Sequence, residues 1–424
     1  MIKNFPQVGR NLQKTDAFEK VTGTAAFGND MEMDGMLYGK VARSRSIHAK
    51  VIDINVEKAL RVPGVVKIIT HKDIPGENSL GMIIKDEPVL VENTIRRYGD
   101  PLCLIAAETK EAAEAAAELV EVHAEELPVL TDPLEAMKDK APLLHTNSNV
   151  ALSRKLIKND VDKSFESCEI IVENTYKTPA VAHAFLEPQV SIASYQDNIL
   201  TFWASSQNIH FDRKEVCRVL NLPQSRVRGV QTVTGGGFGG KLDIASQCHA
   251  ALLSYHTQRP VKINHSFEET MHTSSKRHPY YMKYKTGADR EGRILALDAE
   301  LILDTGAYCS YGPGVLIRGM VHAPGPYEIF SVRVKGYLVY TNNPMAGAMR
   351  GFGVPQVAVA HESQMDIIAE RVGIDPYEIR QKNALREGSR TSTNQVLSQS
   401  VGISQTIEEA RNKTAEIINN GEGK

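Results

Sequence analysis

The chain has 424 residues, of which 42% are hydrophobic and 24% charged, and its formal net charge is −2. That length is sufficient for a large core distributed over two or three domains. Lys and Arg form no basic block and no apolar run approaches the length of a membrane span, so we expect no nucleic-acid partner and no membrane partner.

The two ends of the chain and its cysteines bear on the cellular compartment. Residues 1–6 lack the apolar core of a signal peptide, which predicts a cytoplasmic protein. The five cysteines are odd in number and far apart. They predict buried, inert thiols and give no indication of a disulfide framework, a zinc site or an iron–sulfur site. The polar residues 412–424 are expected to be frayed.

The first part of the chain, residues 1–133, is predicted to be a small domain with both helices and strands. Strands are expected at residues 37–41, 65–70 and 101–107. An Ala- and Glu-rich helix with an apolar stripe is expected at residues 110–122. Prolines mark the exit from this unit, and the polar residues 134–165 are predicted to be a loop-like connector.

A larger α+β domain is predicted from residue 166 to residue 424. Its strands are expected at residues 170–178, 190–195, 199–205, 227–233 and 332–340, with a hairpin over residues 281–304 that turns at residues 289–292. Its helices are expected at residues 212–220, 244–255, 356–372 and 376–385.

Five glycines and one phenylalanine occupy residues 235–240, between a predicted strand and a predicted helix. Glycines at this density allow a backbone to pass close to a ligand and to point its N–H groups at it. A helix that starts directly behind such a stretch favours an anion, usually a phosphate. The glycine stretch, residues 235–240, is therefore predicted to be a ligand-binding loop.

Two familiar phosphate-binding patterns fit this stretch only in part. Gly235, Gly237 and Gly240 fit the dinucleotide pattern G-x-G-x-x-G, but the acidic residue expected about twenty positions later is missing. Gly240 and Lys241 fit the end of a P-loop, but Leu242 stands where a Ser or Thr should bind magnesium. A tight strand-to-helix turn without a ligand remains open.

Two further segments give the stretch a family context. Ser205-Ser206-Gln207-Asn208 precedes it, with Gln207 thirty-one positions before Phe238, and residues 346–356 follow it. In this order and spacing the three segments resemble the molybdenum-binding subunit of the xanthine dehydrogenase family. The resemblance implies an α+β fold, with a small hammerhead α/β domain at residues 1–133. The larger domain, residues 166–424, would be molybdopterin-binding and form the first half of that family's cofactor cradle.

The resemblance also assigns roles to residues on the cofactor side. Gln207 would donate a hydrogen bond from its amide to an oxo ligand of molybdenum. Gly237, Phe238 and Gly239 would bring backbone N–H groups to the ligands of the metal and to the pterin phosphate. Arg350 would contact the metal centre through its backbone, and no side chain would bind molybdenum directly.

On the substrate side the resemblance selects two residues. Phe352 would stack on a flat substrate, and Arg318, thirty-four positions earlier, would stabilise charge on the substrate ring. Arg318 and Gln207 are thus the catalytic candidates. Each residue also has a plainer interpretation: Gln207 as a polar residue at a helix N-terminus, Arg318 as half of an ion pair, and Phe352 as part of the core.

Departures from the family pattern bear on the substrate. Purine hydroxylases of the family have an acidic residue where this chain has Leu242, and carbon monoxide dehydrogenases have a copper-binding cysteine where it has Gly351. Many aldehyde oxidoreductases lack an arginine like Arg318. The resemblance therefore implies hydroxylation of an N-heteroaromatic ring with water as the oxygen source, nicotinate being the leading candidate. An aldehyde or purine hydroxylase, or a non-catalytic assembly protein, are the alternatives.

Partners are implied as well. The family's subunit normally continues into a second half that carries the catalytic glutamate, and this sequence stops at Lys424. We expect a second molybdopterin subunit that supplies this glutamate, a division known for family members of anaerobic bacteria that act on nicotinate. Two [2Fe-2S] clusters and FAD are expected on an iron–sulfur subunit and an FAD subunit. The cofactor is expected to be molybdopterin cytosine dinucleotide, with a sulfido or selenido (sulfur or selenium) ligand on molybdenum.

Overall fold

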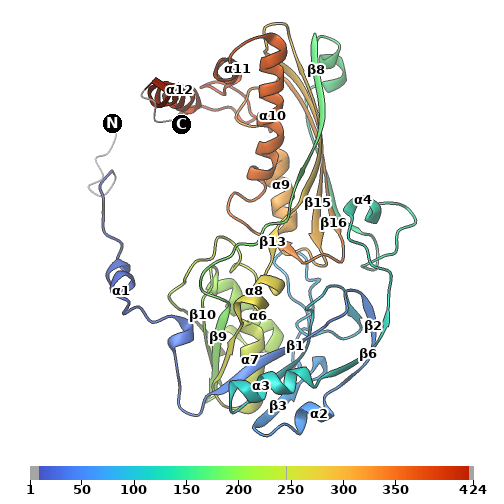
Figure 1. Ribbon diagram of the computed structural model, residues 1–424, viewed down its shortest axis with the longest axis vertical. Helices are drawn as coiled ribbons and strands as arrows, with labels where there is room; N and C mark the ends of the chain where they lie inside the picture. Colours follow the sequence, from blue (N-terminus) through green and yellow to red (C-terminus); the bar gives the residue numbers. More distant parts are fainter. Residues whose placement is uncertain (1–8, 245, 420–424) are drawn as a thin grey trace.

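The computed structural model describes residues 9–244 and 246–419 of the chain. Its two largest sheets lie in different parts of the molecule (Figure 1). The seven-stranded sheet has the order β11-β10-β9-β12-β1-β5-β3, and the five-stranded sheet has the order β7-β16-β15-β14-β8.

The seven-stranded sheet consists of β1 (Leu37–Arg43), β3 (Val65–Ile69), β5 (Pro101–Ala107), β9 (Val190–Gln196), β10 (Ile199–Ala204), β11 (Val227–Gln231) and β12 (Val261–Asn264). The five-stranded sheet consists of β7 (Val150–Lys158), β8 (Ile170–Thr178), β14 (Tyr280–Ala288), β15 (Ile294–Gly306) and β16 (Ser331–Tyr340). Two smaller sheets are formed by β2 (Ala49–Asn55), β4 (Thr94–Ile95) and β6 (Glu121–Glu126), and by β13 (Lys276–Arg277) and β17 (Ala346–Gly347).

The α-helices of the described residues are α1 (Ala17–Thr22), α2 (Glu57–Leu60), α3 (Lys110–Glu118), α4 (Pro133–Ala136), α5 (Val161–Phe165), α6 (Ile209–Leu220), α7 (Gln247–Thr257), α8 (Phe267–Thr273), α9 (Gly312–His322), α10 (Val354–Val372), α11 (Pro376–Asn383) and α12 (Ile403–Asn419). Three 3₁₀ turns are η1 (Gly28–Asp30), η2 (His71–Asp73) and η3 (Gln224–Arg226).

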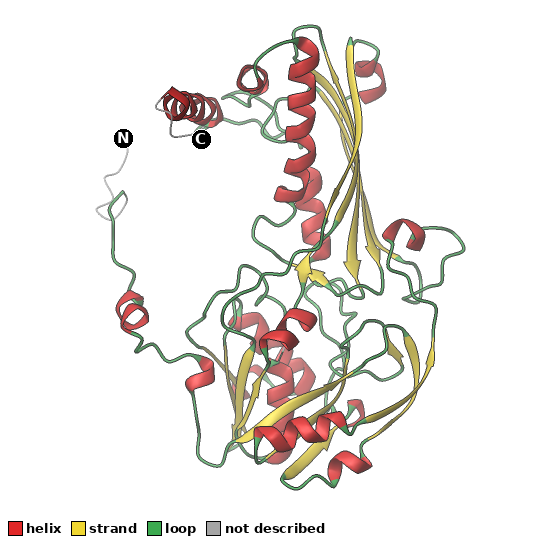
Figure 2. Cartoon of the chain, in the orientation of Figure 1, coloured by secondary structure: helices red, strands yellow, loops and turns green. Residues whose placement is uncertain are grey.

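The core of the five-stranded unit lies between its sheet and two helices. Figure 2 shows α9 and α10 along one face of this sheet, and both helices contact its strands. β15 and β16 are parallel, and α9 is the crossover between them. Buried residues of α9, such as Leu316 and Met320, pack with Leu338 of β16. The hairpin predicted over residues 281–304 is confirmed as β14 and β15.

The seven-stranded unit joins segments that are far apart in the sequence. β1 pairs in parallel with β12, with Leu37 opposite Val261. Helices α6 and α7 supply Val216 and Leu252 to a core that also contains Phe202 of β10. One sheet thus contains strands from both sides of residues 134–165, and the division of the chain at residues 133 and 166 stays a prediction.

Three local predictions are wrong. Residues 134–165 are not a loop-like connector, because α5 and β7 lie there, and β7 is an edge strand paired with β16. Charged residues such as Arg154 and Lys155, typical of an edge strand, obscure its alternation. The predicted helix at 110–122 ends at Glu118, and its last residues belong to β6. The tail was predicted to be frayed over residues 412–424, but it is helical from Ile403 to Asn419, while residues 420–424 lie outside the described part.

The cysteines are free thiols, and four of the five are buried. Cys168 is partly exposed, so the prediction of buried thiols is wrong for this residue. Within the described segments, no helix combines the length and the apolar character that a membrane span needs.

Candidate functional site

The glycine stretch follows β11 and forms a loop in which three residues have left-handed backbone angles. Gly236, Phe238 and Gly239 have φ angles of 95°, 53° and 107°. A phenylalanine rarely adopts this backbone region, and such strain is concentrated at functional sites. The expected helix does not begin directly behind the stretch, since α7 starts at Gln247. Two turn hydrogen bonds, from Gly240 N to Gly237 O and from Leu242 N to Gly239 O, close the loop instead.

The glycines also allow other segments to approach the loop closely. A Cβ at Gly235 would lie 2.5 Å from Cβ of Glu187, and one at Gly237 would lie 2.5 Å from Oε1 of Gln207. A Cβ at Gly239 would overlap the carbonyl oxygen of Ala348. Close packing therefore explains part of the glycine content, whether or not a ligand is bound.

Three consecutive N–H groups of the loop are free to bind a ligand. Gly235 N donates to Glu187 Oε2 at 2.7 Å, and Gly239 N donates to Gln207 Oε1 at 2.8 Å. Between them, the N–H groups of residues 236–238 have no acceptor among residues 9–244 and 246–419. Successive backbone N–H groups in a turn conformation form a concave binding site for anionic oxygens. This arrangement suits an oxygen-rich or phosphate-bearing cofactor.

Gln207 supports the loop and also presents a donor. Its Oε1 accepts hydrogen bonds from the N–H groups of Gly239 and Lys241, at 2.8 and 3.2 Å. Its own backbone N–H donates to Lys241 O at 2.9 Å. The amide Nε2 has no acceptor within the described segments, so it is the group that can bind a ligand. Gln207 lies just before α6, but its side chain binds the loop and does not cap that helix.

Lys241 is engaged inside the protein. Its buried ammonium donates to Glu187 Oε2 and to Ser205 Oγ, both at 2.7 Å. Burial lowers the pKa of Lys241, while the hydrogen bond to Glu187 raises it. This lysine is not available for a phosphate, which agrees with the exclusion of a P-loop by Leu242.

Arg350 and Phe352 lie against the loop. Arg350 N donates to Phe238 O at 2.9 Å, and Arg350 O accepts from Arg277 at 3.0 Å. Both backbone groups therefore have protein partners, and the predicted contact of Arg350 with a metal centre stays a prediction. Phe352 is half-buried with a φ of 52°, and its ring meets that of Tyr311 edge to face, with the centroids 6.0 Å apart.

Arg318 lies on α9 with its side chain exposed. One turn earlier on this helix, a Cβ at Gly314 would lie 3.1 Å from the ring of Phe352. Residues four apart share a helix face, so Arg318 and Phe352 lie on the same side of α9. No carboxylate of the described chain forms an ion pair with Arg318, so the ion-pair interpretation is not supported within this chain.

Tyr311 is a site residue that the sequence reasoning missed. Its ring contacts Phe352, and a polar interaction with the side chain of Asn208, next to Gln207, partly offsets the effect of burial on its pKa. Burial raises the pKa of Tyr311 to about 12. Tyr311 therefore links the loop side of the site to the α9 side. Its position seven residues before Arg318, about two helical turns, was the available signal.

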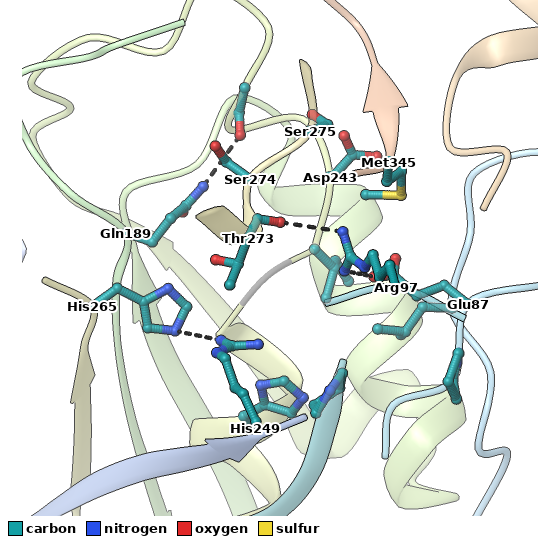
Figure 3. A pocket seen from close by; sticks show the side chains of 16 residues that line it. Glu87, Arg97, Gln189, Asp243, His249, His265, Thr273, Ser274, Ser275 and Met345 are labelled. Atoms are coloured by element: carbon teal, nitrogen blue, oxygen red, sulfur yellow. Dashed lines mark hydrogen bonds and ion pairs between the residues drawn. The ribbon is translucent and has the colours of Figure 1, made fainter. Parts of the chain in front are cut away.

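A small cavity of about 40 Å³ lies beside Gly240, beneath the loop (Figure 3). In its wall, Arg97 and Glu87 point toward one another at 2.9 Å, and Gln189 donates to Gly240 O at 3.2 Å. Burial lowers the pKa of the lining residues His249 and His265 to about 4 and about 3. Room for about two or three water molecules makes this cavity a support of the loop and not a substrate site.

In the part of the chain that the structure describes, no three His, Cys, Asp or Glu side chains are grouped so that they could hold a metal ion. The site thus offers backbone N–H groups, an amide, a guanidinium and aromatic rings.

Comparisons with known proteins match both parts of the chain. Residues 22–128 match the aldehyde oxidase and xanthine dehydrogenase a/b hammerhead domain, and residues 144–384 match the molybdopterin cofactor-binding domain. The predicted fold class, a hammerhead domain followed by a larger mixed α+β domain, is confirmed.

Relatives and solved structures agree with these matches. The chain is 46% identical over 99% of its length, and 99% of the other chain, to the nicotinate dehydrogenase large molybdopterin subunit of Eubacterium barkeri. It is 33% identical to the xanthine dehydrogenase molybdenum-binding subunit of Escherichia coli O157:H7, covering 94% of this chain and 54% of that one. The aldehyde oxidoreductase of Desulfovibrio gigas superposes with a TM-score of 0.92 at 30% identity, covering 96% of this chain and 46% of that one. The chain thus spans nearly all of the first relative and about half of the other two.

Proposed function

Because the chain belongs to the xanthine dehydrogenase family, we propose that it is a molybdenum hydroxylase subunit acting on an N-heteroaromatic ring. Nicotinate, converted to 6-hydroxynicotinate, is the leading candidate substrate. The relative that is 46% identical over 99% of the chain is named as a nicotinate dehydrogenase subunit, which supports this choice. Water would supply the oxygen.

The observation that carries the proposal is the free donor set of the loop. The N–H groups of residues 236–238 and the amide Nε2 of Gln207 all lack acceptors in the described chain. They suit the oxygen atoms of a molybdopterin cofactor, which when bound supplies the transfer of oxygen from water and accepts two electrons. Gly237, Phe238 and Gly239 would shape the cradle, and Arg350 would hold it through its bond to Phe238 O.

The substrate side would be formed by α9 and Phe352. The guanidinium of Arg318, which forms no ion pair with the described residues, would meet negative charge that develops on the ring, or would pair with a substrate carboxylate. The ring of Phe352, held by Tyr311, would fix the orientation of the substrate by stacking or by an edge contact. Leu242 stands where purine hydroxylases of the family have an acidic residue, so the site would offer a purine ring no acidic partner at this position.

Further polypeptides would complete the enzyme. A second molybdopterin subunit would supply the glutamate that acts as general base. An iron–sulfur subunit with two [2Fe-2S] clusters and an FAD subunit would carry the electrons away, and the cofactor would be the cytosine dinucleotide form with a sulfido or selenido ligand. The relative that matches over 99% of its own length is named as a large subunit, which supports a site that is completed by another polypeptide. We place the assembly in the cytoplasm.

The test is a substrate panel on the complex purified with its co-expressed partners. We expect about one molybdenum per copy of this chain by elemental analysis, and turnover of nicotinate well above that of xanthine or an aromatic aldehyde. Preference for xanthine or the aldehyde would reassign the substrate class. A complex without molybdenum would favour a non-catalytic assembly protein, and full turnover by this chain alone would overturn the divided site.

A further inference from the structure

A larger cavity, of about 1040 Å³, lies at the end of the five-stranded sheet where β15 and β16 begin. It is lined by the end of β7, the start of β15, α11 and residues 384–394, near the top of the molecule in Figure 1. Ser310, just beyond the other end of β15, bonds Asp243 near the glycine stretch at 2.5 Å. Because β15 has thirteen residues, the two sites are separated by about 40 Å.

The wall of this larger cavity, called the basic cavity below, carries a strong excess of positive charge. Two acidic residues, Glu328 and Glu378, face five cations, which are Lys158, Arg293, Lys382, Arg386 and Arg390. Among the residues that the structure describes, no carboxylate lies within ion-pair distance of any of these five. By contrast Arg380, on the same helix α11, is held by Glu362 and Asp366, both at 2.7 Å.

Backbone carbonyls hold three of these cations in place, Lys158, Arg386 and Arg390. Lys158, which is only 6% exposed, donates to Ile329 O at 2.7 Å. Arg386 donates to Gln381 O at 3.1 Å, and Arg390 donates to Asn394 O at 3.3 Å. Such contacts fix the side chains without neutralising their charge. A concave surface with one sign of charge attracts a counter-ion, and arginine forks match phosphate oxygens.

Glu328 offsets only part of this positive charge, since the wall has five cations and two carboxylates. Its two carboxylate oxygens accept hydrogen bonds from Ser389 Oγ at 2.7 Å and from the backbone N–H of Arg390 at 3.2 Å. The glutamate thereby orders the segment that carries Arg386 and Arg390. The net positive charge of the cavity is therefore part of its construction.

An aromatic ring lies among these cations. Phe330 lines the cavity and is 64% exposed, although most phenylalanines of a folded protein are buried. Its carbonyl accepts a hydrogen bond from Asn159 Nδ2 at 2.6 Å, which ties the start of β16 to the end of β7. An exposed ring beside arginines is suited to stack on a flat base, and the volume is that of a small-molecule site.

We propose that the basic cavity binds a nucleotide, with its phosphates on Arg293, Arg386 and Arg390 and its base against Phe330. At about 40 Å from the glycine stretch, this would be a second ligand and not the nucleotide of the molybdenum cofactor. The site is independent of the proposed hydroxylase activity.

The test is calorimetric titration of the full chain with ADP, inorganic pyrophosphate and adenosine. We expect saturable binding of ADP, weaker binding of pyrophosphate, and ADP affinity at least tenfold lower in the double variant Arg293→Gln/Arg386→Gln. Lys67→Gln, which removes an exposed cation of β3, is the charge control and should leave the affinity unchanged. Circular dichroism and the melting temperature confirm that each variant is folded.

A second variant separates the two halves of the proposed site. Phe330→Ala should weaken ADP several-fold and leave pyrophosphate unchanged; an equal loss for both would overturn the base contact. No saturable binding of ADP, or equal affinity in the double variant, would overturn the site. A double variant that changes only the oligomeric state would identify the cavity as a protein-docking surface and would also overturn the proposal.

Discussion

The two walls of the candidate site are built in opposite ways. The loop wall is the glycine stretch, residues 235–240, with the segments packed against it, and the helix wall is α9. On the loop wall, the glycines are packed against Glu187, Gln207 and Ala348, and Lys241 is buried in an ion pair. On the helix wall, Arg318 is exposed and forms no ion pair within the described chain. The comparison indicates that close packing determines the conformation of the loop wall, while the helix wall presents a charge that can interact with a substrate. Variants of the first should lose stability, and variants of the second should lose turnover.

The strongest test of the loop wall is Lys241→Met. It would leave the carboxylate of Glu187, whose side chain is 11% exposed, without its cation, and should lower the free energy of unfolding by about 3–5 kcal/mol. Urea denaturation measures the change. The control is Lys283→Met, whose pair with Glu300 at 3.9 Å is exposed and should cost less than about 1 kcal/mol. Equal losses of unfolding free energy in the two variants would contradict a structural role of the Lys241–Glu187 ion pair in the loop wall.

On the helix wall, Arg318→Ala should act on catalysis and spare the fold. We expect kcat/KM of the complex to fall by about 100- to 1000-fold, the size of a lost transition-state contact, with an unfolding free energy within about 0.5 kcal/mol of wild type. Steady-state kinetics and denaturation are measured together. Arg411→Ala, at an exposed arginine of α12, is the matched control. Near-normal turnover of Arg318→Ala would remove the assigned role.

The packing of the loop can be separated from its backbone angles with Gly239→Ala. Strain at φ 107° and the overlap with Ala348 O should together cost about 3 kcal/mol. Gly388→Ala, at φ 89° with no atom within 4 Å, should cost only the strain, about 1 kcal/mol. Thermal denaturation of both variants gives the difference. Similar losses would show that packing against Ala348 does not matter.

The cavity beneath the loop wall should make stability sensitive to acid. The pKa of His249 is lowered to about 4 in the folded chain, so below the ordinary value near 6.5 the unfolded chain takes up a proton that the folded chain does not. Stability should fall between pH 6.5 and 4, and His249→Gln should reduce this slope by up to about 1.4 kcal/mol per pH unit. The exposed His123 provides the control His123→Gln. An unchanged slope in His249→Gln would contradict the assignment.

The link between the two walls should have the smallest effect. Tyr311→Phe removes the hydroxyl that interacts with the side chain of Asn208 but keeps the ring against Phe352. Loss of a single polar contact of a hydroxyl costs no more than about 0.5–1.5 kcal/mol, so we expect a fall of about tenfold or less in kcat/KM, while Tyr311→Ala should lose more. If Tyr311→Phe lost as much as Arg318→Ala, the hydroxyl would have a direct catalytic role.

The sequence by itself determined the elements with strong local patterns and the identity of the loop. The apolar run of β5, the alternation of β14 and β15, and the apolar face of α10 all specify their structure locally. The glycine stretch indicated the family only together with residues 205–208 and 346–356, at the spacing that the three segments have in this sequence.

Tertiary structure alone decided the rest, and α9 shows why. The glycines in its sequence disfavour a helix, but a Cβ at Gly312 would lie 2.8 Å from Thr305 Oγ1 and one at Gly319 would lie 2.6 Å from Tyr280 Oη. The missing side chains let the helix pack against the sheet, and packing overrides local propensity. The same holds for β7, which is stabilised by β16, and for β1, whose partner β12 lies more than two hundred residues away. Because contacts between distant segments leave no local period, the side-by-side placement of Arg318, Phe352 and Tyr311 follows only from the fold.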